Sequence, residues 1–69
     1  MLEPLDVMKV QEILAAAKRQ KRRVTGRRTD GSVFTGIPDY AEGDGSWWLI
    51  AGREDPLVQI NNEEVAEIR

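Results

Sequence analysis

Residues 30–36 of the chain read DGSVFTG, and this stretch decides the fold. Asp30-Gly31 is a strong β-hairpin signal, because glycine tolerates the positive φ angle that tight hairpin turns require. Phe34 is the only phenylalanine in the chain, and we interpret it as an anchor of the hydrophobic core. Gly36, together with Gly26 before the turn, indicates places where strands bend or lie unusually close to each other.

Short β segments extend outward from this hairpin in both directions. Strands are predicted at residues 22–29, 33–41, 46–51, 57–60 and 65–68. Polar or glycine-containing turns are predicted at residues 30–31, 42–45, 52–56 and 61–62. Pro38 falls within the second strand. Because proline cannot donate to a strand ladder, we expect Pro38 to mark a bend.

An amphipathic helix is predicted before the strands, at residues 4–19. Its apolar residues recur at three- and four-residue spacing and form one stripe: Val7, Val10, Ile13, Leu14 and Ala17. Pro4 suits the first turn of a helix, where its missing N–H would have no partner. The expected fold class is therefore mostly β, with an N-terminal helix and, over residues 22–69, a five-stranded, strongly bent antiparallel barrel. Residues 1–69 form one domain in this interpretation.

The chain contains neither cysteine nor histidine. This composition excludes disulfides, thiolate or imidazole zinc sites, and nucleophiles of the Cys or Ser–His type. Adjacent carboxylates fall in turns rather than across a cleft, so we expect no enzyme activity, no metal and no cofactor. No apolar run approaches the ~20 residues of a membrane helix, and the N-terminus lacks the features of a signal peptide. We therefore expect a cytoplasmic protein without membrane contact.

Positive charge is concentrated in one window of the chain. Seven of the ten basic residues lie at residues 18–28, and all twelve acidic residues lie outside this window. Such a block has the character of an electrostatic footprint for nucleic acid. The alternative is a solvated helix end and strand whose charges pair with acidic residues of the same or a neighbouring subunit. If RNA binds here, the candidate residues are Arg22, Arg23, Arg27 and Arg28.

Two stretches of the chain together resemble the sequence motifs of the Sm-like family, which includes Lsm proteins and bacterial Hfq. The first motif contains DG-x-x-aromatic-x-G, and it is matched by Asp30, Gly31, Phe34 and Gly36. The second motif, I-R-G-x-x-V-x-x-I, corresponds to INNEEVAEI at residues 60–68, where Ile60, Val65 and Ile68 match. The resemblance spans nearly the whole chain and implies an Sm-like or SH3-like barrel.

The resemblance also implies a pore-side pocket for RNA bases, formed here by Glu42, Asp44, Ser46, Asn61 and Asn62. In the family, one side chain stacks on the base, an Asn hydrogen-bonds it, and an Arg-Gly pair completes the pocket. These positions hold Asp44, Ser46 and Asn61-Asn62 in this chain. A carboxylate at the stacking position cannot stack as an aromatic or Arg plane does, and it repels phosphate. The resemblance therefore implies an RNA-associated protein whose usual base pocket is degraded.

Copies of the chain are expected to assemble into a homo-oligomeric ring through the fourth and fifth strands, as in the Sm-like family. Edge strands invite another chain, and head-to-tail pairing around an axis leaves no edge open. Assembly would also stabilise a domain of only 69 residues. The expected partners are thus the chain itself and single-stranded RNA. The competing hypothesis is a homo-oligomeric SH3-like structural or protein-interaction module that binds no RNA.

Trp47 and Trp48 are adjacent, so their rings must point to opposite faces of a strand. We expect Trp47 to point into the core together with Leu49. Trp48 is expected to pack under the helix or at a subunit interface, and stacking on a nucleic-acid base is its functional alternative.

Overall fold

A computed structural model describes residues 1–52 and 57–69 of the chain. An N-terminal helix is followed by five strands, with one short 3-10 helix before the last strand. The elements are α1 (Val7–Gln20), β1 (Val24–Arg28), β2 (Val33–Ala41), β3 (Ser46–Ile50), β4 (Leu57–Asn61), η1 (Asn62–Glu64) and β5 (Val65–Ile68). The predicted arrangement of one helix before five antiparallel strands is confirmed.

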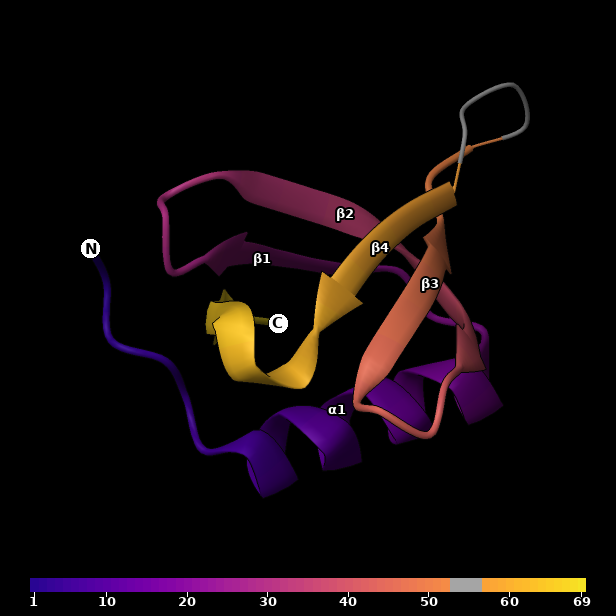
Figure 1. Cartoon of the computed structure of the whole chain (residues 1–69). Helices are drawn as coiled ribbons and strands as arrows, with labels where there is room; N and C mark the ends of the chain where they lie inside the picture. Colours follow the sequence, from indigo (N-terminus) through magenta and orange to yellow (C-terminus); the bar gives the residue numbers. More distant parts are fainter. Residues whose placement is uncertain (53–56) are drawn as a thin grey trace.

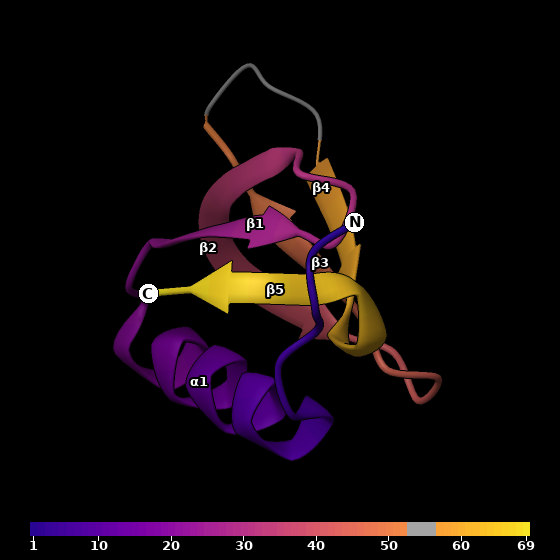
Figure 2. The same ribbon diagram turned by 90° about the vertical axis from the view of Figure 1, so that its left-hand side faces the viewer.

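The strands form one antiparallel sheet in the order β4-β3-β2-β1-β5. β2 belongs to both halves of the sheet, because its first part pairs with β1 and its second part pairs with β3. Figure 1 shows β3 and β4 crossing the direction of β1, and Figure 2 shows the same curvature in a view turned by 90°. Within the described residues, β4 and β5 are the two edges of this curved sheet.

The bend lies in the middle of β2. Pairing with β1 reaches Gly36, and pairing with β3 starts at the next residue. A Cβ atom at Gly36 would come within 2.9 Å of the Leu49 Cβ and 3.0 Å of the Ile50 carbonyl oxygen, so β3 leaves no room for a side chain there. Pro38 is fully buried, and the register between β2 and β3 shifts between Pro38 and Tyr40. The expected close approach at Gly36 and the irregularity at Pro38 are confirmed.

Glycine is also required at two other positions of the β1–β2 hairpin, one in the turn and one in β1. Gly31 forms the turn with a φ angle of 91°, which residues other than glycine rarely adopt. Its N–H donates to the Arg28 carbonyl oxygen at 2.9 Å. Gly26 lies on the inner face of β1, where a Cβ atom would meet the Glu67 carbonyl oxygen and the Phe34 ring. β1 can therefore pack between β5 and the core only because residue 26 has no side chain.

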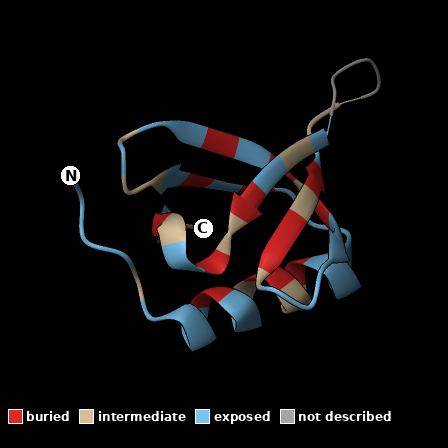
Figure 3. Ribbon diagram, viewed as in Figure 1, coloured by how far each residue is buried: buried red, intermediate tan, exposed pale blue. Residues whose placement is uncertain are grey.

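α1 lies along one side of the curved sheet and completes the core (Figure 1). Figure 3 shows the buried residues on the side of α1 that faces the strands. The core consists of Val10, Leu14, Ala17, Val24, Phe34, Trp47, Leu49, Ile60 and Val65. The predicted core position of Phe34 and the inward orientation of Trp47 and Leu49 are confirmed. Val7, which the sequence pattern placed on the buried stripe, is instead 42% exposed.

α1 begins three residues later than the sequence pattern predicted. Asp6 is the N-cap, since its Oδ1 accepts a hydrogen bond from the Met8 N–H at 2.8 Å, and Pro4 therefore lies outside the helix. The helix ends where Lys21 adopts a left-handed conformation with a φ angle of 52°. This turn delays the start of β1 to Val24, so the first strand is shorter than the predicted residues 22–29.

The other boundaries agree more closely with the sequence. β2 and β5 have the predicted bounds, whereas the predicted tight turn at residues 61–62 is the start of η1. The predicted turn at residues 52–56 lies largely outside the described residues. No helix in the part of the chain that the structure describes is both long and apolar enough to cross a membrane.

Candidate nucleic-acid interface

The residues that the resemblance assigns to a base pocket come from two segments that the fold brings together. These segments are the β2–β3 connection and the end of β4. Ser46 and Asn61 are register partners in the β3–β4 ladder, and the Asn61 Nδ2 donates to the Ser46 Oγ at 3.4 Å. Next to them, the Asn62 N–H donates to the Gly45 carbonyl oxygen at 2.9 Å. Ser46 and Asn61, 15 residues apart in the sequence, are therefore neighbours.

Two carboxylates flank this pair. The Asp44 Oδ1 accepts a hydrogen bond from the Ser46 N–H at 3.0 Å, and the Glu42 Oε1 accepts one from the Trp48 Nε1 at 3.2 Å. Both acidic residues are exposed. The negative charge of these two carboxylates, beside Ser46 and Asn61, opposes the approach of a phosphate group, as the acidic sequence of the β2–β3 connection predicts.

Asn62 contributes to the packing of α1. It is 5% exposed, and its Nδ2 donates to the Gln11 Oε1 at 2.9 Å. The same oxygen accepts a hydrogen bond from the Trp47 Nε1 at 3.0 Å. The indole that hydrogen-bonds α1 is thus that of Trp47, whereas the half-buried Trp48 bonds Glu42. Gln11 joins the helix to both β3 and η1 through a single oxygen atom.

Arg23 and Arg27 lie on the outer face of the sheet, on either side of Thr25. For Arg27 this orientation follows from the alternation along β1, whose other face is buried. Arg23, the residue before β1, continues this alternation and is exposed. The Arg23 Nη1 donates to the Ala51 carbonyl oxygen at 3.0 Å, and the Arg27 Nη1 donates to the Gly31 carbonyl oxygen at 3.0 Å. Backbone oxygens therefore hold both guanidinium groups at the surface.

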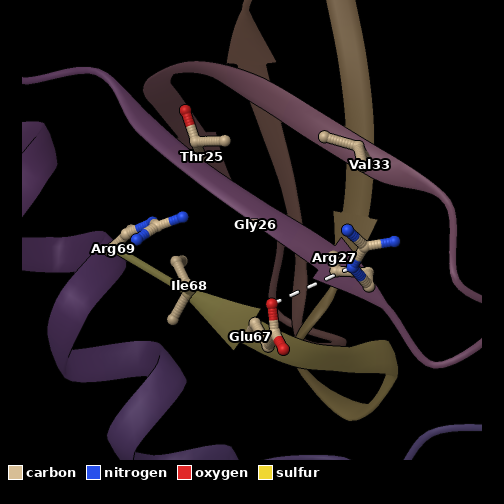
Figure 4. A pocket seen from close by; sticks show the side chains of 7 residues that line it. All are labelled: Thr25, Gly26, Arg27, Val33, Glu67, Ile68 and Arg69. Carbon is tan, nitrogen blue, oxygen red and sulfur yellow. Dashed lines mark ion pairs between the residues drawn. The ribbon is translucent and has the colours of Figure 1, made fainter.

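A depression of about 390 Å³ runs along the outer face of β1 and β5. Figure 4 shows Arg27 and Glu67 pointing toward each other within it, and the Arg27 Nε lies 3.9 Å from the Glu67 Oε2. Thr25, Val33 and Arg69 also line this depression. The ion pair is largely exposed, with 44% and 70% of the two side chains accessible. Such pairs contribute only ~0–1 kcal/mol, so Glu67 holds Arg27 weakly.

Arg28 points into the interior and bridges the gap between β1 and β4. Its Nη2 donates to the Gln59 carbonyl oxygen at 3.0 Å, and its Nε lies 3.6 Å from the Glu64 Oε1. The guanidinium carbon lies 5.6 Å from the centre of the Phe34 ring, and the side chain is only 22% exposed. Arg28 is therefore largely engaged within the fold and does not belong to the outer surface of β1.

Arg22 lies beyond the end of α1, where it is exposed and its Nε donates to the Gln20 Oε1 at 3.4 Å. The four arginines of the basic window thus separate: Arg23 and Arg27 share the outer face of β1, Arg22 lies by the helix, and Arg28 points inward.

Sequence reasoning missed Gln11, and it named Arg28 only as a candidate RNA contact and missed its role inside the fold. The inward position of Arg28 could have been inferred from the alternation along β1, because Arg28 lies on the same face of the strand as the buried Val24. Gln11 gave no signal beyond its place beside the apolar stripe of α1.

Comparison with known proteins reveals no relative: no family model, no curated protein and no solved structure matches the chain significantly. Functional inference therefore depends on the residues of this chain and their geometry.

Proposed function

We propose that the chain is a divergent Sm-like domain that assembles into a closed homo-oligomeric ring and binds single-stranded RNA on the outer face of β1. The main support is the strand order β4-β3-β2-β1-β5 combined with the bend of β2 at Gly36. A curved five-stranded sheet with the fourth and fifth strands at its edges is what the sequence resemblance implies.

The ring forms when β4 of one copy pairs with β5 of the next copy. The Asn62 N–H donates to the carbonyl oxygen of Gly45, the residue before β3, so alternation directs the backbone groups of Gln59 away from β3. The Gln59 carbonyl oxygen accepts a hydrogen bond from Arg28 of the same copy, which leaves the Gln59 N–H for a neighbouring strand. On β5, Arg69 exchanges backbone hydrogen bonds with Thr25, which directs the backbone groups of Ile68 away from β1. Outward-facing groups of this kind are the ones that another strand can bind, and head-to-tail pairing closes a ring.

RNA crosses the outer face of β1 over Arg23 and Arg27, and Arg22 extends this surface toward the end of α1. Arginine binds phosphate through two parallel donors and also stacks on bases, so a pair of surface arginines can hold a single strand without a dedicated base pocket. The Thr25 and Thr35 hydroxyls lie 3.1 Å apart on this face and supply further hydrogen-bonding groups. The carboxylates of Glu42 and Asp44 make the pore-side rim the poorer site for RNA.

A titration of short labelled RNAs against the assembled protein tests this proposal, with DNA of the same sequence as a control. The affinity should fall steeply with salt, because bound phosphates release counterions. The double variant Arg23→Glu/Arg27→Glu should abolish binding. Each of the single variants Arg23→Glu and Arg27→Glu should weaken binding clearly, whereas Lys9→Glu, the same change of charge as either single variant but on the exposed side of α1, should leave most of it. RNA binding that ignores both salt and the two arginine changes would refute the outer-face site.

A second candidate function is a ring-forming or SH3-like module that binds proteins and no RNA. The inward orientation of Arg28, together with the exposed carboxylates of Glu42 and Asp44, favours this alternative because both reduce the positive charge available to RNA. It predicts a stable oligomer that fails to bind any short RNA even at low salt. The RNA titration therefore separates the two functions.

A further inference from the structure

We propose that residues 2–5 form a strap that covers the first part of the β5 edge and lifts when β4 of another copy pairs along the whole of β5. Figure 2 shows this segment between α1 and the β1–β2 hairpin, where it passes the first part of β5. The inference rests on the proposed assembly through β4 and β5. It adds a segment of the chain itself that competes with the neighbouring copy and so controls how tightly copies associate.

The backbone of β5 has two positions that face away from β1, Val65 and Ile68. Val65 is the register partner of Arg28, and the residue before it, Glu64, accepts a hydrogen bond from the Thr29 N–H at 2.8 Å. Alternation therefore directs the backbone groups of Val65 away from β1. The irregularity that follows in the register of β1 with β5 makes Ile68 the next such position.

The strap already occupies the first of these two positions. The Leu5 N–H donates to the Val65 carbonyl oxygen at 2.8 Å, and Val65 is 0% exposed. Ile68, in contrast, is partly exposed. A neighbouring β4 can therefore reach Ile68 directly, but it can reach Val65 only after Leu5 has left. The Leu5 N–H and an N–H of β4 are thus alternative donors to the same carbonyl oxygen.

Few contacts hold the strap on its own copy. Its second backbone hydrogen bond runs from the Leu2 N–H to the Thr29 carbonyl oxygen at 2.8 Å. Leu2 and residues 3–4 are exposed, and within residues 1–5 it is the half-buried Leu5 that packs against the core. Segments with few buried apolar contacts and exposed backbone open at a lower free energy than the rest of a fold. The strap can therefore lift while the sheet stays intact.

The strap can also lift without unwinding α1. Asp6 follows it directly, and the Asp6 Oδ1 accepts a hydrogen bond from the Met8 N–H at 2.8 Å. The Asp6 carbonyl oxygen accepts a second one from the Val10 N–H at 3.1 Å. Both bonds lie within the first turns of the helix and involve none of residues 2–5. The hinge is therefore the connection between Leu5 and Asp6.

Proline substitutions test the strap, because proline lacks the N–H that each strap bond requires. Light scattering over a range of protein concentrations gives the dissociation constant of the assembly for each variant. We expect Leu2→Pro to tighten assembly about fivefold, which corresponds to the net contribution of one hydrogen bond. Leu5→Pro should tighten it at least about tenfold, because the apolar contact of Leu5 is lost as well. Leu2 is exposed and outside the core, so Leu2→Pro provides the test if Leu5→Pro does not fold.

Glu3→Pro is the matched control. Like Leu5→Pro, it places a second proline beside Pro4, but the Glu3 N–H has no acceptor among the described residues. This variant should assemble as tightly as the wild type. An independent measurement is the exchange of the Leu5 amide hydrogen, followed by NMR in the wild type. It should be at least about tenfold faster in the assembly than in the single copy, because the bond to Val65 is lost.

The outcomes separate the strap from the ring. Proline variants that assemble no more tightly than the wild type and Glu3→Pro, or a Leu5 amide that stays equally protected in the assembly, would overturn the strap and leave the ring intact. A monomeric wild type beside Leu2→Pro or Leu5→Pro variants that assemble would support the strap and refute a ring of the unmodified chain. If the wild type and all variants stay monomeric, both proposals are wrong.

Discussion

At the scale of single residues, the tip of the β1–β2 hairpin contains a carboxylate with a perturbed pKa. The Ser32 Oγ and the Ser32 N–H both donate to the Asp30 Oδ1, at 2.6 Å and 2.8 Å. These two bonds, the side-chain bond first, lower the pKa of Asp30 below its usual value of 3.8. Because the pKa is lower in the folded state than in the unfolded state, the ionised carboxylate stabilises the fold at pH values above its unfolded-state pKa. This stabilisation is lost as the pH falls through the folded-state pKa.

Ser32→Ala should therefore raise the pKa of Asp30 toward 3.8. The variant should also lose less stability than the original chain on acidification below that value. A carboxyl-carbon NMR titration measures the pKa directly, and Ser32→Thr, which retains a hydroxyl group, is the control. An unchanged titration midpoint in the alanine variant would show that the hydroxyl does not control this carboxylate.

A second feature at the scale of single residues is the guanidinium group of Arg28, which joins two parts of the fold. It connects β1 to the Gln59 carbonyl oxygen and to Glu64 from a position that is only 22% exposed. Arg28→Lys keeps the charge but removes the planar fork that reaches both partners. We expect the free energy of unfolding to fall by about 1.5–3 kcal/mol, as for hydrogen bonds to charged groups. Arg22→Lys should change it by no more than about 0.5 kcal/mol. Urea denaturation of both variants compares them, and equal stability would contradict the bridging role.

The sequence could have placed Arg28 inward by alternation alone, but its charge argued for the surface. The conflict is resolved by Glu64, Gln59 and the ring of Phe34, which partner the guanidinium group inside the fold. None of these partners is near Arg28 in the sequence, so the pattern of charges around residues 18–28 could not reveal them. The same limit applies to Gln11, whose two donors come from β3 and η1.

At the scale of elements, the packing of β1 against β5 and the core depends on close backbone approach at Gly26. A Cβ atom there would collide with the β5 backbone and with the Phe34 ring. We expect Gly26→Ala to lower the free energy of unfolding by roughly 1–3 kcal/mol, the usual range for overpacking a core. At Gly43 a Cβ atom would meet nothing within 4 Å, so Gly43→Ala is the matched control. If urea denaturation gave the two variants the same stability, the contact of β1 with β5 could not be as tight as the structure indicates.

The boundaries of helices and strands were predictable where all local sequence signals indicated the same position. β2 and β5 match because hydrophobic alternation and flanking turn residues agree there. The start of α1 was not predictable from Pro4, because Asp6 captures the Met8 N–H and starts the helix further on. The start of β1 was missed because Lys21 takes a left-handed conformation that sequence patterns rarely assign to lysine.

At the scale of the whole molecule, the juxtaposition of Ser46 and Asn61 depends on the complete sheet. Local patterns predicted each strand but not the pairing of β3 with β4, and the expectation that these residues meet came from the family resemblance. Alternation along β1 accounts for the outward position of Arg27, whereas the bonds of Gln11 to Trp47 and Asn62 needed the position of α1 against β3 and η1. Long-range packing thus determines the candidate sites more than any local motif does.

The same scale gives the last prediction, which concerns assembly. A chain of 69 residues with two strand edges gains stability when copies pair, so its thermal midpoint should rise with protein concentration and light scattering should detect a closed multimer in the micromolar range. Gln59→Pro removes an N–H that faces away from β3, and proline is tolerated in an edge strand at such a position. This variant should be a folded monomer by circular dichroism and light scattering, with a midpoint independent of concentration. Gln59→Ala, which keeps the N–H, should assemble normally. A wild-type monomer, or a Gln59→Pro variant that still assembles, would show that β4 does not form the contact between copies.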